Sequence, residues 1–213
     1  MYKHNLVEPV GKIVCVGRNY LEHIKELNNP VPKAPIIFMK PSTSFVPLSE
    51  PISLPSHAKE CHHEIEIAVL IGETIHAGET IDVKSKIAGY GLALDLTLRD
   101  IQQQLKQNGH PWEMAKAFDK SCPISPFIPH EEFPDLQDIS FSLTINGEIR
   151  QQGNSKMMMY GIVELINYIC KYFTLVKGDV ILTGTPSGVA ALNSQDKLQL
   201  ELNGKHHFTT QVL

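Results

Sequence analysis

Two glutamates stand two residues apart in an apolar run, and this spacing is suited to binding a cation. The run reads His62-His63-Glu64-Ile65-Glu66-Ile67-Ala68-Val69-Leu70-Ile71. Side chains of a strand alternate between its faces, so Glu64 and Glu66 share one face, with Cα atoms about 6 to 7 Å apart. Like charges this close raise one another's pKa unless a cation compensates them. The pattern predicts either a cation site or a half-exposed strand that carries two acids by chance.

A third acid, Asp95, follows the strand-like run from Ala88 to Leu94 and favours the cation site. It precedes Thr97-Leu98-Arg99-Asp100, which resembles a capping box that opens a helix. An acid at a strand end can project into a cleft, or it can simply interact with the dipole of the next helix. Three carboxylates suit a hard cation such as Mg²⁺ or Mn²⁺. Zinc ranks lower despite His62 and His63, because it usually takes more His or Cys ligands.

A possible acid-base pair lies nearer the N-terminus. The spacing of apolar residues predicts a helix over Tyr20 to Leu27, with Asn19 as N-cap and Glu22 three positions later. His23 and Glu26 are three apart and therefore share a face. A carboxylate beside an imidazole orients it and raises its basicity, as a general base that activates water requires. Alone, such a pair is more often an incidental feature of an exposed helix, so the catalytic interpretation depends on a nearby metal site.

Three further features are weaker candidates. Lys116 and Lys40 could hold a substrate carboxylate, but an isolated lysine is more often a solvated surface group. The segment Thr183-Gly184-Thr185-Pro186-Ser187-Gly188 could offer backbone N–H and hydroxyl donors, or it could be a tight turn. It lacks the Gly-Lys-Thr ending of a phosphate-binding loop, so we reject a nucleotide role.

The elements that must position these residues are mostly short strands, which favours an α+β fold dominated by strands. Helical patterns cover 20–27, about 98–107 and 163–172, and they do not alternate regularly with the strands as a doubly wound parallel sheet would require. Asn146-Gly147 and Asn203-Gly204 each follow an apolar run and predict two antiparallel hairpins. The predicted strands are 12–16, 36–39, 64–71, 88–94, 140–145, 179–183 and 198–202.

Composition excludes several classes of protein. The 213 residues carry 19 Lys and Arg against 23 Asp and Glu, a formal charge of -4, without a basic run that would follow a nucleic acid. That length predicts one domain with a sizeable core. The chain has no apolar stretch of the roughly 18 residues that a membrane span needs and no signal-peptide pattern at its start.

The four cysteines lie far apart, at Cys15, Cys61, Cys122 and Cys170. This spacing fits neither a zinc site nor the dense disulfides of a small secreted scaffold. We therefore expect reduced, mostly buried thiols in a cytoplasmic protein.

Taken in order, these motifs resemble the fumarylacetoacetate hydrolase superfamily, and most closely its short single-domain acylpyruvase and oxaloacetate decarboxylase branch. The resemblance extends from about Lys12 to the C-terminus. It is carried by Gly17-Arg18-Asn19-Tyr20 with His23 and Glu26, Lys40-Pro41, His63-Glu64-Ile65-Glu66, Leu94-Asp95-Leu96-Thr97-Leu98-Arg99-Asp100, Lys116 and Leu182-Thr183-Gly184-Thr185-Pro186.

The resemblance implies a β-rich mixed fold, a β-sandwich roll with few short helices, in one catalytic domain over residues 1–213. It implies a homodimer with Mg²⁺ or Mn²⁺ on Glu64, Glu66 and Asp95. His23 and Glu26 would form the water-activating pair, and Lys116 would help to hold the substrate. The remaining substrate contacts are expected from four other residues of the matching motifs: Arg18, Lys40, Arg99 and Thr185.

The implied activity is hydrolysis of an acylpyruvate to pyruvate and a carboxylic acid. The 2-oxo acid would chelate the metal, which would stabilise the enolate formed when the C3–C4 bond breaks. Because the same enolate serves other reactions, the alternatives are oxaloacetate decarboxylation, oxaloacetate keto-enol tautomerisation and a catechol-pathway isomerisation or decarboxylation. A non-catalytic metal-binding or metabolite-binding module needs no base such as His23. A purely structural protein would leave the acids uncompensated.

Overall fold

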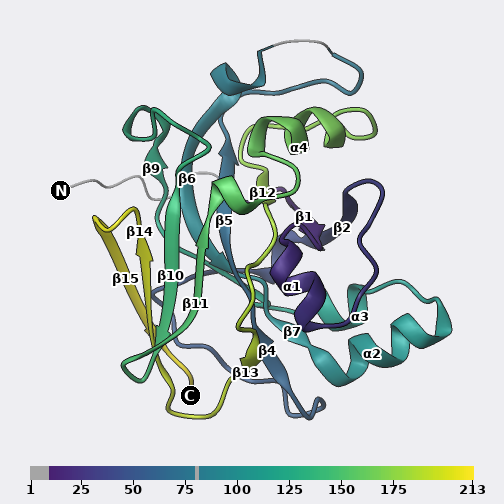
Figure 1. The fold of residues 1–213 in the computed structure, drawn as a ribbon, viewed down its shortest axis with the longest axis vertical. Coiled ribbons are helices and arrows are strands. Elements are labelled where there is room, and N and C mark those ends of the chain that lie inside the picture. Colours follow the sequence, from purple (N-terminus) through teal and green to yellow (C-terminus); the bar gives the residue numbers. More distant parts are fainter. Residues whose placement is uncertain (1–9, 80–81) are drawn as a thin grey trace.

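The protein is built mainly of strands, with a few short helices at the edges of the sheets (Figure 1). A computed structural model describes residues 10–79 and 82–213. Residues 1–9 and 80–81, which the expected domain over residues 1–213 includes, lie outside the described residues.

The central sheet is mixed. Within it, β1 (Lys12–Gly17) runs parallel to β12 (Val180–Leu182) and β3 (Phe45–Pro47) runs parallel to β8 (Cys122–Ile124), while the other pairs are antiparallel. This pairing agrees with the prediction against a doubly wound parallel sheet. In order across the sheet, the strands are β2 (Ile36–Pro41), β1 (Lys12–Gly17), β12 (Val180–Leu182), β5 (Ile65–Ile71), β6 (Ile87–Leu94), β8 (Cys122–Ile124) and β3 (Phe45–Pro47), and β9 (Ile128–Pro129) pairs with β6.

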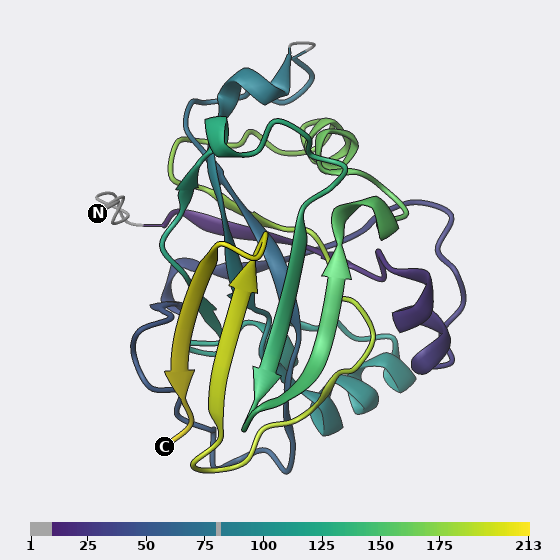
Figure 2. The same cartoon turned by 60° about the vertical axis from the view of Figure 1, so that its left-hand side comes forward.

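A second, antiparallel sheet has the order β11 (Glu148–Asn154), β10 (Ser140–Ile145), β14 (Lys197–Leu202) and β15 (His206–Gln211). Figure 2 shows its strands side by side. Asn146 and Gly147 have φ values of 53° and 86°, and Asn203 and Gly204 have values of 52° and 65°. Positive φ at both central residues is what a tight hairpin turn needs, so both predicted hairpins are confirmed.

The two sheets pack against each other through one apolar core. Ile67 and Leu92 of the central sheet belong to the same buried cluster as Leu143 and Leu200 of the second sheet. The alternation predicted for the run after Glu64 is present, since Ile65, Ile67, Val69 and Ile71 all belong to this cluster, whereas Ala68 belongs to a second buried cluster. Packing of two sheets with few helices confirms the expected β-rich α+β class.

The helices are short and lie outside the sheets. They are α1 (Leu21–Glu26), α2 (Arg99–Asn108), α3 (Glu113–Lys116) and α4 (Ile162–Ile169), with 3₁₀ turns at Ser42–Ser44, Val83–Lys86, His130–Glu132 and Ser155–Met157. A small third sheet joins the start of α2 to the main body. Its strands, in order, are β13 (Ala190–Ala191), β4 (Cys61–His63) and β7 (Thr97–Leu98). None of the helices in the described part of the chain is long and apolar enough to cross a membrane.

Two predicted helix caps are wrong. The residue that precedes α1 is Tyr20, without a side-chain cap, because Asn19 Oδ1 accepts a 2.9 Å hydrogen bond from Tyr160 N while Asn19 Nδ2 donates to Tyr160 O and Thr183 O. Likewise, α2 begins after Leu98 without a side-chain cap, and Thr97 Oγ1 donates instead to Asp95 O at 2.9 Å. In both places a backbone group outside the helix binds the polar side chain instead.

Candidate active site

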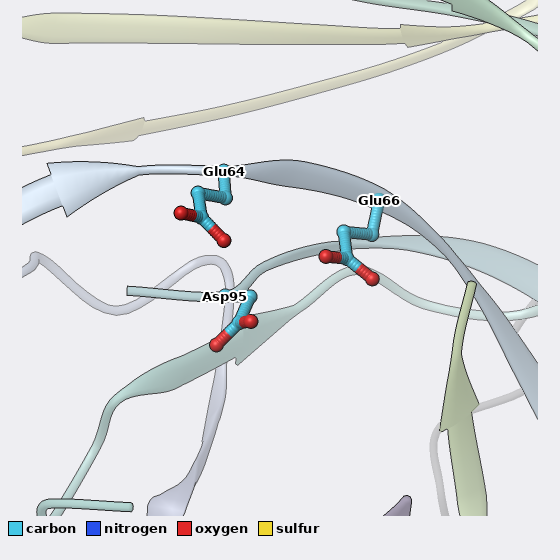
Figure 3. A group of neighbouring side chains, drawn as sticks. All are labelled: Glu64, Glu66 and Asp95. Atoms are coloured by element: carbon cyan, nitrogen blue, oxygen red, sulfur yellow. The ribbon is translucent and has the colours of Figure 1, made fainter. Parts of the chain in front are cut away.

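Three buried carboxylates lie close together where the start of β5 pairs with the end of β6. Glu64 fills the break between β4 and β5, Glu66 lies within β5, and Asp95 directly follows β6. Strand pairing matches Glu66 with Ala93, and the amide of Asp95 donates to Glu64 O at 2.8 Å. One ligand atom of each carboxylate lies within 4.8 Å of the other two, and the three side chains lie next to one another (Figure 3). Each residue is at most 5% exposed.

Three cations compensate this negative charge. Lys116 Nζ, at the end of α3, lies 2.7 Å from Glu64 Oε2 and 2.6 Å from Asp95 Oδ2. Arg99, the first residue of α2, pairs with Glu64. Burial alone would raise the pKa of Glu64, but Lys116 and Arg99 outweigh it and hold that pKa below its ordinary value. Lys40 Nζ approaches Asp95 Oδ1 at 2.9 Å from β2.

Glu66 is the least compensated of the three acids. Its Oε2 accepts a 2.6 Å hydrogen bond from the amide of Gly184, whose φ of 96° suits glycine and whose position leaves no room for a Cβ beside Asn19. Burial, and then the charge of Asp95, raise the pKa of Glu66 well above its ordinary value. Another positive charge at this point would therefore stabilise its ionised form.

The donor set fits a divalent cation that prefers oxygen. All three ligands are carboxylates, and Asp95 Oδ1 is buried without a hydrogen-bond partner although Lys40 Nζ is close. His63 lies outside this cluster, with Nδ1 at 2.9 Å from Gln151 Oε1, and His62 pairs with Glu60. Three oxygens without a histidine or cysteine suit Mg²⁺ or Mn²⁺ better than zinc.

In the His23 and Glu26 pair, His23 lines the same cavity. His23 Nδ1 is 3.2 Å from Glu26 Oε2, while Glu26 Oε1 accepts a 2.8 Å hydrogen bond from the amide of Gly188. Burial lowers the pKa of His23, although Glu64 and Glu26 oppose that shift. The imidazole is consequently neutral at pH 7 and free to accept a proton.

The residues expected to contact the substrate fall into two groups. Arg18, Arg99 and Thr185 line the cavity together with His23 and the three acids. Lys40 is 0% exposed and does not line it; its Nζ contacts Ser121 O, Ser121 Oγ and the carbonyls of two other residues as well as Asp95. Its position suits support of Asp95 and the surrounding backbone.

Several functional candidates escaped the sequence analysis. Gln102 accepts a 2.6 Å hydrogen bond from Arg99 Nη1, and both line the cavity with Lys106 of the same helix. These residues follow Arg99 by three and seven positions, so helical periodicity from Arg99 was the signal that could have found them. Gln151 of β11 accepts one hydrogen bond from Ile65 N at 3.0 Å, and its side-chain nitrogen donates to Thr185 Oγ1 at 2.7 Å and to Pro186 O at 2.9 Å. No pattern in the polar sequence of β11 distinguishes it.

A strand-rich fold with a buried triad of carboxylates beside a His/Glu pair has known counterparts. Residues 12–213 match the model of the fumarylacetoacetate (FAA) hydrolase C-terminal family, so the chain belongs to this family. The resemblance inferred from the sequence motifs is thereby confirmed.

Individual relatives cover nearly the whole chain. The chain is 51% identical over all of its length to oxaloacetate tautomerase YcgM of Escherichia coli, which is covered completely. It is 40% identical to the human mitochondrial oxaloacetate tautomerase FAHD1, over 94% of this chain and 90% of that protein. Among solved structures, the fumarylpyruvate hydrolase of Pseudomonas aeruginosa in complex with Mn²⁺ and pyruvate superposes with a TM-score of 0.91 at 31% identity, over 99% of this chain and 93% of that chain.

Proposed function

We propose that this protein is a divalent-metal-dependent enzyme that interconverts the enol and keto forms of oxaloacetate. The observation that carries the proposal is the triad of Glu64, Glu66 and Asp95 within 4.8 Å, in one cavity with His23 and Lys116. The names of the relatives at 51% and 40% identity support oxaloacetate as the substrate over the acylpyruvate expected from the sequence.

Glu64, Glu66 and Asp95 would hold the Mg²⁺ or Mn²⁺ ion. When bound, the ion would act as a Lewis acid toward the 2-oxo carbonyl and stabilise negative charge that develops on its oxygen. The name of the Pseudomonas relative, in complex with Mn²⁺ and pyruvate, supports this pairing of a divalent ion with a 2-oxo acid.

The chain's own cations would orient the acid. Lys116 lies within hydrogen-bond distance of two of the carboxylates that would bind the metal ion. A substrate that binds this ion through its C1 carboxylate would therefore lie beside the Lys116 ammonium, which would offset the charge of that carboxylate. Arg99 is held by Glu64 and Gln102 and would present the rest of its guanidinium to the cavity.

His23 would move the proton. Neutral at pH 7, it can take a proton from C3 of the keto acid, and Glu26 would stabilise the imidazolium that forms. The C2 oxygen then gains a proton, which gives the enol, and the reverse sequence returns the keto form. One proton leaves carbon and one arrives at oxygen, so no carbon–carbon bond breaks and no other reactant is needed.

Hydrolysis of acylpyruvates is the second candidate, because a His/Glu pair in a metal cavity can also deprotonate water. The structural relative named as a fumarylpyruvate hydrolase supports it. Decarboxylation of oxaloacetate would use the same enolate, and a 41% identical relative from Dictyostelium discoideum carries that name.

A kinetic panel tests the proposal. Purified protein with added Mg²⁺ or Mn²⁺ is assayed for enol–keto conversion of oxaloacetate, for CO₂ release from oxaloacetate and for pyruvate release from acetylpyruvate. We expect the highest kcat/KM for tautomerisation. A higher kcat/KM for acetylpyruvate hydrolysis than for oxaloacetate tautomerisation would overturn the proposal and favour an acylpyruvate hydrolase.

We also propose that residues 1–213 act as one catalytic domain, in a homodimer, in the cytoplasm. The match over residues 12–213 supports a single domain, and four buried free cysteines support a reducing compartment. Leu21 and Met157 are about half exposed around one hollow and would suit a contact between copies. Light scattering coupled to size-exclusion chromatography tests this, and a monomer mass would contradict the dimer.

A further inference from the structure

The active-site cavity holds two cations that compensate none of its carboxylates. Lys106 of α2 and Arg18, which follows β1, both line the cavity. Within the described residues, neither forms an ion pair with Asp or Glu: Arg18 Nη1 lies 3.5 Å from Pro30 O, and Lys106 Nζ lies 5.6 Å from the centroid of the Trp112 ring. Half-buried cations without a carboxylate partner are costly, so their presence in a cavity suggests an anionic ligand.

An aromatic wall formed by Phe38 and Trp112 lies between Lys106 and Lys116. Lys116 Nζ lies 5.2 Å from the centroid of Phe38, and the Phe38 and Trp112 centroids are 5.9 Å apart. Lys106 stands at the Trp112 end of this wall. The cavity therefore has one ammonium group near the three carboxylates and another beyond the two rings.

Local structure directs both cations into the cavity. Arg18 has a φ of 59°, in the left-handed region that non-glycine residues adopt rarely and often at functional sites. Lys106 follows the buried Gln102 by four positions and Arg99 by seven, so all three share one helix face, and all three line the cavity.

The charges of the cavity favour a ligand with two negative groups. Three acids and four Lys or Arg side chains line it, so a bound divalent ion brings the net charge of the lining to plus three when His23 is neutral. A monocarboxylic 2-oxo acid compensates one of these charges at its C1 end. A dicarboxylic acid compensates a second at its far end, where Lys106 and Arg18 form no ion pair with any Asp or Glu that the structure describes.

We propose that Lys106, with Arg18 beside it, binds the second carboxylate of a dicarboxylic 2-oxo acid and so makes the site select such dianions over monocarboxylic ones. This inference rests on the proposed function, and it assigns the preference for oxaloacetate to particular residues of this chain. Lys106 is thus a specificity-determining residue, and the proton transfer at His23 does not depend on it.

Lys106→Met is the direct test, because methionine keeps an apolar stem against Trp112 and removes the charge. We expect the KM for oxaloacetate to rise about 10- to 100-fold, as loss of a charge-assisted hydrogen bond implies, with kcat nearly unchanged. The inhibition constant of pyruvate, which lacks the second carboxylate, should stay the same. Lys106→Arg should restore the wild-type KM.

The matched control is Lys120→Met, which removes the same charge from an exposed side chain that pairs with Glu50 on the surface. It should leave both constants unchanged, and thermal melts should show that all variants fold. An unchanged KM for oxaloacetate in Lys106→Met overturns the inference. An equal weakening of pyruvate also overturns it, because the effect would then be general to the cavity.

Failure of the proposed function would look different, since wild-type protein would then convert no oxaloacetate. In that case calorimetric titration of the Mn²⁺-loaded protein with pyruvate and with oxaloacetate decides the inference. Lys106→Met must weaken oxaloacetate binding alone, and equal affinities in the variant and the wild type would contradict the role of Lys106.

Discussion

The amide of Asp95 donates a 2.8 Å hydrogen bond to the carbonyl oxygen of Glu64, so the backbone itself holds two of the three site carboxylates side by side. Because the bond continues the pairing of β5 with β6, the placement of these acids depends on two of the most buried strands of the protein. Lys116 then bridges their side chains. The chain thus concentrates negative charge at a rigid position and leaves Glu66 the least compensated of the three acids.

Replacement of Glu66 by glutamine should abolish metal binding without unfolding the protein. The amide oxygen can still accept the hydrogen bond from Gly184, and the side chain resembles the protonated form that burial already favours in Glu66. Saturating Mn²⁺ should raise the Tm of the wild type by about 5 to 10 °C and leave that of the variant unchanged. Differential scanning fluorimetry with and without EDTA measures this.

The control for that experiment is Glu50→Gln, which removes a surface carboxylate. It should respond to Mn²⁺ like the wild type. A full Mn²⁺-induced shift in Glu66→Gln would remove Glu66 from the ligand set.

His23→Ala should reduce proton-transfer reactions more than decarboxylation. Loss of a general base typically costs about 100- to 10,000-fold in kcat, whereas CO₂ release from oxaloacetate needs no base to begin. Tautomerisation and acetylpyruvate hydrolysis should therefore fall together, with decarboxylation retained. Equal losses in all three assays would show that His23 maintains the structure of the cavity and does not act as the general base.

Gln151→Leu should lower stability and metal affinity together. Its side chain joins the backbone of Ile65 to Thr185 and Pro186, and thus links the Glu64 side of the site to the loop that binds Glu66. Leaving these buried groups without partners should cost about 2 to 4 kcal/mol in the free energy of unfolding. Urea titration measures the loss.

The neighbouring Gln152 is exposed, and Gln152→Leu should change the free energy of unfolding by less than about 0.5 kcal/mol. Similar losses in the two variants would mean that the network around Gln151 contributes little.

The affinity for oxaloacetate should fall as pH rises through about 8. Burial, and then the positive charges of Arg99, Arg18 and Lys116, lower the pKa of Lys106 to about 8, with Glu64 as the opposing charge. Above that pH Lys106 loses the charge that would bind the distal carboxylate, so kcat/KM should decline. Lys106→Arg should move the decline to higher pH, and Lys106→Met should abolish it. A decline that persists unchanged in Lys106→Met would assign it to another group.

Sequence patterns predicted the buried part of this fold better than its edges. The alternation after Glu64 and the apolar run before Asp95 identify β5 and β6 because burial dictates their residue types. The polar strands β11 and β15 carry no such signal, and only the Asn-Gly turns beside them indicated that partner strands exist.

The residues of the site also differ in how well the sequence predicts them. Glu64, Glu66 and Asp95 stand out because acids are unusual within or directly beside apolar strands, and the structure brings them together. Lys106 and Gln151 resemble surface residues in the sequence. The packing of α2 places Lys106 in the wall of the cavity, and the packing of β11 buries Gln151 beside the site. Asn19 was assigned to a helix cap because its partners near Tyr160 and Thr183 are distant in sequence.

The central claim is that oxaloacetate tautomerisation depends on one divalent ion held by Glu64, Glu66 and Asp95. Its most direct test is titration of EDTA-stripped protein with Mn²⁺, following free Mn²⁺ by electron paramagnetic resonance and enol–keto conversion in the same samples. We predict that the rate rises in proportion to bound Mn²⁺ and saturates at about one ion per chain, as three convergent carboxylates imply. Full activity in the stripped protein, or saturation with Mn²⁺ without tautomerisation, would contradict the account.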